Sequence, residues 1–179
     1  LQWQVWPYIA TGLLVVLIFW SRALVHTLSF IGWPLEFGHT FVYFGATLIE
    51  AVALSQVANP VHWYALNTAY AAAVWGLYAY DLRAVRRHAG DFSTPDERAL
   101  LEDILRDQRV NIVFMMPAAV AFQGFAWWLV QAHPKTFIDD GWHLLLAGMT
   151  LLFSINYLVG GVRLLQRRHR WIVSRHAQE

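Results

Sequence analysis

The chain has 179 residues, of which 58% are hydrophobic and only 14% carry a formal charge. A soluble domain is about 25% charged, so this composition argues against an ordinary water-soluble protein and favours one embedded in a lipid bilayer. The absence of cysteine excludes disulfides, thiolate metal sites, iron–sulfur clusters and a cysteine nucleophile, and a net charge of +1 gives no general attraction for nucleic acid.

Apolar runs predict about five membrane-spanning helices, because roughly 20 helical residues cross a bilayer. They cover about residues 5–21, 35–56, 61–80, 110–131 and 141–163. The first run lacks the basic start of a signal peptide, so we expect a retained span. Residues 23–35 are apolar but contain Gly32 and Pro34, and they either extend the first span or lie along the membrane surface. The sequence thus predicts a single all-α domain over residues 1–179, a polytopic membrane bundle.

The basic residues predict the orientation of this bundle. Arg22, six arginines within residues 81–109 and five from Arg163 onward make twelve of the thirteen basic residues, and they share one side if residues 81–109 form a cytoplasmic loop. Only Lys135 lies on the other side. The excess of Lys and Arg in cytoplasmic loops therefore predicts an outside N-terminus and a cytoplasmic C-terminus, in a membrane of the bacterial inner type.

The loop over residues 81–109 contains its own helix signal. Thr94 and Glu97 have the spacing of a capping box, with Pro95 at the first helical position. An apolar stripe beside charged residues follows, which predicts a short amphipathic helix leading into the fourth span. The basic tail over residues 164–179, including Arg167 to Arg170, is expected to anchor on anionic lipid headgroups.

The most informative polar residue is Glu50, which lies deep in the second span. A carboxylate in hydrocarbon costs roughly 2.5–3.5 kcal/mol on insertion scales, so it usually faces a partner or a wet cavity. Glu36, His39 and Tyr43 share one helical face with Glu50. This stripe predicts a polar path along the second span.

Asn67 on the third span and Gln123 on the fourth are expected at a depth similar to that of Glu50. A carboxyl between two amides can hold a proton or a weakly bound cation. The alternative is a protonated Glu50 that only joins helices by hydrogen bonds. The fifth span carries a second stripe, which indicates either a polar core or close helix packing: His143, Ala147, Thr150, Ser154, Tyr157 and Gly161.

A second group of candidate residues lies near the outer ends of the spans: His62, His133, Asp140 and His143. Imidazoles and carboxylates together suit zinc, copper or iron, and His62 with His143 is the one plausible pair for a haem. A quinone site near the outer face is a further option. The alternative is that the aspartates cap a helix and the histidines lie on the surface.

Three functions follow from these patterns. The first is proton or cation handling centred on Glu50, in a homo-oligomer. The second is an accessory or anchoring subunit of a larger respiratory or photosynthetic membrane complex. The third is a membrane enzyme or redox protein with a metal, haem or quinone at the outer face. No motif indicates a family, and the sequence specifies no cofactor.

Overall fold

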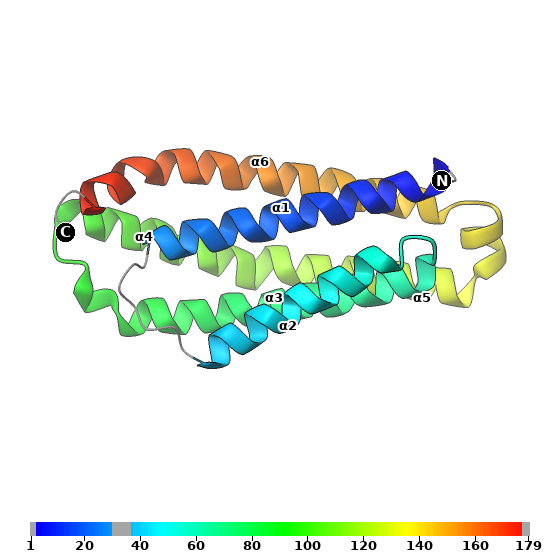
Figure 1. Cartoon of the computed structure of the whole chain (residues 1–179), viewed down its shortest axis with the longest axis horizontal. Helices are drawn as coiled ribbons and strands as arrows, with labels where there is room; N and C mark the ends of the chain where they lie inside the picture. The colour runs from blue at the N-terminus through cyan, green and yellow to red at the C-terminus, as the bar shows by residue number, and fades with distance from the viewer. Residues whose placement is uncertain (1–2, 30–36, 177–179) are drawn as a thin grey trace.

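The computed structural model is an elongated bundle of helices that run close to one long axis (Figure 1). It describes residues 3–29 and 37–176, with the side chains of 23–29, 37–39, 167, 170–172 and 174–176 left out of the description. Within those residues there is no β-strand, which confirms the prediction of an all-α fold. The α-helices are α1 (Trp6–Ser29), α2 (Phe37–Ser55), α3 (Pro60–Arg87), α4 (Pro95–Val110), α5 (Met116–Ala132) and α6 (His143–His176).

Short 3₁₀- and π-helical segments precede or connect these α-helices. They are the 3₁₀ turns η1 (Trp3–Val5) and η2 (Ala89–Asp91) and the π-helical turns η3 (Asn111–Met115) and η4 (Lys135–Asp139). Through η3, α4 and α5 form one continuous rod. We call the end of the bundle where α3 passes into α4 the α4 end. The N-terminus and the α2–α3 and α5–α6 connections lie at the opposite end (Figure 1).

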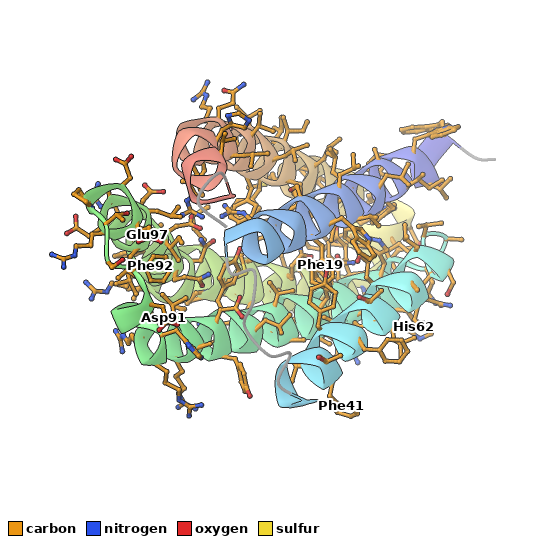
Figure 2. All side chains as sticks on the ribbon, turned by 60° about the vertical axis from the view of Figure 1, so that its left-hand side comes forward. Phe19, Phe41, His62, Asp91, Phe92 and Glu97 are labelled. Carbon is orange, nitrogen blue, oxygen red and sulfur yellow. The ribbon has the colours of Figure 1, made fainter. Side chains whose placement is uncertain are left out.

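The central helix of the packing is α3, which packs on both α2 and α5, while α1 packs along α6. The side chain of Leu54 on α2 packs directly over Gly12 on α1, where a Cβ atom would lie 2.3 Å from Cδ2 of Leu54. Each α-helix has one face buried in the bundle and another that is exposed, as two phenylalanines on α1 and α2 illustrate. Phe19 is 6% exposed and Phe41 is 67% exposed, and Figure 2 shows Phe19 pointing into the bundle and Phe41 away from it.

Among the described residues, three helical stretches are long and apolar enough to cross a membrane: Trp3–Arg22, Pro95–Ala132 and His143–Gln166. The helix α2 exposes Phe41, Phe44, Leu48 and Val52 on one face, a patch that lipid would cover. These observations support a membrane protein. The apolar part of α2 is shorter than a full crossing and α3 contains polar residues, so the count of about five spans and the orientation stay predictions.

The predicted boundaries agree with the helix ends in most places. The first helix continues to Ser29, so the part of residues 23–35 that is described extends α1, and residues 30–36 lie outside the described residues. The turn predicted at Asn59 and Pro60 is the start of α3. There the Asn59 side chain accepts a hydrogen bond from the backbone N–H of His62 at 3.2 Å.

The amphipathic helix predicted after Thr94 is α4, and its capping box is present. The Thr94 hydroxyl accepts from the backbone N–H of Glu97, and the Glu97 carboxylate accepts from the backbone N–H of Thr94 at 2.9 Å. The apolar face of α4 packs against the end of α3, where Val85, Phe92 and Leu100 are buried together. This face is therefore part of the protein core and is not available to lie on a membrane surface.

The capping box gives a prediction on pH. The backbone N–H groups of Thr94 and Ser93, which donate to the Glu97 carboxylate, lower the pKa of that group below its ordinary value. A lowered pKa in the folded state adds stability that is complete above the ordinary carboxyl pKa of about 4.3 and is lost as the pH falls through the folded value. We therefore expect wild type to unfold at a higher temperature than Glu97→Gln at neutral pH, and the difference to shrink below about pH 4.

Thermal unfolding in detergent, followed by circular dichroism from pH 7 to pH 3, measures this difference. The exposed Glu102 on the same helix provides the matched control, since Glu102→Gln removes a carboxylate outside the capping box. A difference between wild type and Glu97→Gln that stays constant over this range would contradict the prediction.

Candidate functional site

Glu50 lies in the interior of the bundle, as its sequence position predicts. Its side chain is only 5% exposed, and its Oε1 atom has no hydrogen-bond partner among the described residues. Ala46 and Ala53, one turn away on either side, are also buried on this face of α2. Tyr43 on α2 and Tyr70 on α3 belong to the same side-chain cluster as Ala46, and both rings pack against Phe19 on α1, with centroids 4.5 and 6.1 Å from that of Phe19. We call Glu50, Tyr43 and Tyr70 the Glu50 site.

The two amides that were predicted to surround Glu50 are buried but make their hydrogen bonds elsewhere. The Asn67 amide donates to the backbone carbonyl of Trp63 in its own helix at 2.9 Å. The Gln123 amide donates to the hydroxyl of Thr150 on α6 at 3.1 Å, and its carbonyl oxygen is buried with no partner in the described part of the chain. A layer in which Glu50, Asn67 and Gln123 act together therefore stays a prediction.

The remaining members of the predicted stripe are placed only in part. Glu36 lies outside the described residues, and His39 lies in the first turn of α2 without a described side chain. The ring of Tyr43 is half-buried, and its centroid lies 4.5 Å from that of Phe19 on α1. Of the stripe, only Tyr43 and Glu50 can thus be described as neighbours within the bundle.

The four candidate residues near the opposite end differ in their surroundings. His143 is buried, where its Nδ1 atom makes a hydrogen bond with the hydroxyl of Tyr8, and its backbone carbonyl accepts from Tyr64 at 2.9 Å. His62 is exposed, and its Nδ1 atom is within hydrogen-bond distance of the side chains of Asn59 and Gln56. His133 and Asp140 are exposed on the surface.

The histidine and acidic side chains of the described residues also form no cluster suited to a metal. Within residues 3–29 and 37–176, no group of three or more His, Asp and Glu side chains is arranged to hold a metal ion. The ring of His133 packs edge-on against Trp128 on α5, with centroids 5.8 Å apart. A metal, haem or quinone site at this end is therefore still a prediction, and among the candidates only His143 belongs to the core.

The structure reveals a group of charges at the α4 end that sequence patterns did not indicate. Arg22 on α1 donates to Asp107 on α4 at 2.7 Å. Arg168 on α6, which is 4% exposed, donates to Asp103 at 2.6 Å and lies 3.6 Å from Asp107. We call these four residues the charge cluster. The predicted role of Arg168 as a lipid anchor is wrong, because this side chain is buried in ion pairs.

A chain of polar groups extends the charge cluster into the bundle. Asn111, at the start of the π-helical turn η3, donates to the side chain of Asp107 at 3.2 Å and accepts a hydrogen bond from the hydroxyl of Tyr157. The hydroxyl groups of Tyr157 and Tyr78 are 2.7 Å apart, which joins α6 to α3. The guanidinium of Arg22 lies 5.0 Å from the centroid of the Tyr157 ring. Single π-helical turns are frequent at functional sites.

Comparison with known proteins adds no assignment. The chain matches no protein-family model, no curated protein sequence and no solved structure at a significant level. The arguments on function therefore rest on the geometry of the Glu50 site and the charge cluster.

Proposed function

We propose that this chain is an integral membrane protein that handles protons at Glu50. The observation that carries the proposal is a mid-helix carboxyl buried in the bundle, with one oxygen that makes no hydrogen bond to the described residues. Ionisable groups inside membrane proteins usually belong to substrate or proton pathways. A carboxyl with so few partners is expensive to keep charged, so gaining and losing a proton is the chemistry that it can perform.

The surroundings of Glu50 favour a proton over a metal cation. Hard cations such as Ca²⁺ and Mg²⁺ require about six oxygen ligands. Within residues 3–29 and 37–176, Glu50 is not part of any group of three or more His, Asp and Glu side chains arranged to hold a metal ion. Tyr43 and Tyr70, which pack on the same Phe19 ring, supply hydroxyl groups to the Glu50 site, and a hydroxyl group can both donate and accept a hydrogen bond.

Proton flux into liposomes tests this function. We expect Glu50→Gln to lower the flux driven by an imposed pH gradient by about tenfold or more, because the amide cannot release a proton. The flux is measured with a pH-sensitive dye trapped in vesicles that contain the purified protein. Glu102→Gln, the same substitution on the exposed face of α4, is the matched control and should conduct as wild type does. Wild-type flux through Glu50→Gln would remove Glu50 from this role.

A second candidate function is that of an anchoring subunit in a larger membrane complex. It is favoured by the aromatic surface of α5, where Phe125 and Trp128 stack on each other while both are exposed. Such a surface could pack against another membrane protein as well as against lipid. Purification in mild detergent distinguishes the two functions. A stable homo-oligomer favours proton handling, and isolation only together with larger partners favours the anchoring role.

A further inference from the structure

The charge cluster lies along the bundle from the Glu50 site, toward the α4 end. Tyr70 of the Glu50 site lies on α3, the helix that also carries Tyr78, and its ring centroid is 6.1 Å from that of Phe19. Tyr78 follows Tyr70 by two turns on α3 and is hydrogen-bonded to Tyr157, which leads through Asn111 to Asp107. Polar groups therefore continue from the middle of the bundle to its α4 end, with the charge cluster as their last step.

At the α4 end, the arginines and aspartates of the charge cluster pair with one another. Two arginines and two aspartates sum to zero net charge, and the pairs join α4 to α1 through Arg22 and to α6 through Arg168. The side chains of Arg22 and Asp107 are 19% and 16% exposed, so water reaches the edge of the cluster. The Arg22–Asp107 pair lies beside Tyr157, whose ring centroid is 5.0 Å from the Arg22 guanidinium.

Stability alone does not explain charges at this position. Replacing buried ion pairs by apolar residues of similar size is often neutral or stabilising. Salt bridges between helices can exchange partners, and Asp107 already lies within reach of two arginines, at 2.7 Å and 3.6 Å. The adjoining π-helical turn η3 begins at Asn111 and interrupts the regular α-helix between α4 and α5.

We propose that the charge cluster is a gate at the α4 end of the proton route through Glu50, and that it opens when Arg22 separates from Asp107. This inference rests on the proposed function of Glu50. In the closed state the paired charges and the Tyr78–Tyr157–Asn111 chain exclude water from the route. Movement of α4 away from α1 admits water to the tyrosine pair.

The test is the double variant Arg22→Gln with Asp107→Asn, which removes both charges and leaves neither partner buried alone. We expect its proton flux in liposomes to exceed that of wild type by about fivefold or more. Adding Glu50→Gln to the double variant should abolish the increase, because the route still passes Glu50. The double variant His88→Gln with Asp91→Asn removes an exposed His–Asp contact of 3.0 Å and should leave the flux unchanged.

The possible outcomes distinguish failure of the proposed gate from failure of the proposed proton handling at Glu50. Wild-type flux through Glu50→Gln overturns the proposed function. If Glu50→Gln blocks the flux and the folded Arg22→Gln/Asp107→Asn variant does not raise it, only the gate is overturned and the cluster is a structural clamp. If this double variant does not fold, Arg22→Lys decides, since it keeps the charge but loses the planar guanidinium that pairs with Asp107. Raised flux supports the gate, and unchanged flux overturns it.

Discussion

Replacing Trp63 with alanine is expected to lower the free energy of unfolding of the bundle by about 3 kcal/mol. Trp63 is 1% exposed, and its ring packs edge-on against Tyr8 on α1 with centroids 4.7 Å apart. Lipid tails are as apolar as the protein core, so little of this loss comes from transfer out of water. It comes from the cavity that the indole leaves and from the packing contacts that its neighbours lose.

Titration with SDS in detergent micelles, followed by circular dichroism, measures this loss without depending on tryptophan fluorescence. Trp142 is the matched control, since it is 53% exposed near the same end of the bundle. Trp142→Ala should change the stability by less than about 1 kcal/mol. Equal losses from Trp63→Ala and Trp142→Ala would contradict the packing that places Trp63 at the centre of the core and Trp142 at its surface.

The features that could be predicted from sequence are those that depend on residues close together in the chain. The capping box at Thr94 and Glu97 involves a spacing of three residues, and it is present with both hydrogen bonds. The turn at Asn59 and Pro60 depends on two adjacent residues and begins α3 as expected. The burial of Glu50 was predictable because a carboxylate within an apolar run seldom faces lipid.

The charge cluster could not be predicted, because its pairs join residues far apart in the chain. Arg22 and Asp107 are separated by 85 positions, and Asp103 and Arg168 by 65. Local patterns gave these residues other roles. Asp103 and Asp107 matched the solvated face of an amphipathic helix, and Arg168 belonged to a basic tail. The one available signal was that Arg22 is the first charged residue at the end of a long apolar run, where a buried partner is favourable.

The hydrogen-bond partners of the Asn67 and Gln123 amides could not be predicted from the sequence either. Asn67 and Gln123 are buried, but the predicted depth along a helix does not specify which helix a side chain faces. Gln123 faces Thr150 because the α5 and α6 helices approach each other there, and Asn67 is satisfied by its own helix. The direction of each amide depends on helix rotation, which follows from tertiary packing.

Replacing Asp107 with alanine is expected to lower the free energy of unfolding by about 3–5 kcal/mol, because it leaves the Arg22 guanidinium without its acidic partner. Asp107 also accepts from Asn111 at 3.2 Å, so the same change weakens the connection between η3 and the charge cluster. The double variant Arg22→Met with Asp107→Ala removes both charges. It should be more stable than Asp107→Ala alone, although it carries one more substitution.

This reversal distinguishes a buried ion pair from two independent contacts. Independent contacts would add, so the double variant would be less stable than either single variant. Asp96 lies on the exposed face of α4, and Asp96→Ala serves as the control that should change stability by less than about 0.5 kcal/mol. SDS titration of the single, double and control proteins gives all the required free energies. Additive losses would show that Arg22 has another partner for its charge, and the closed α4 end would then not depend on Asp107.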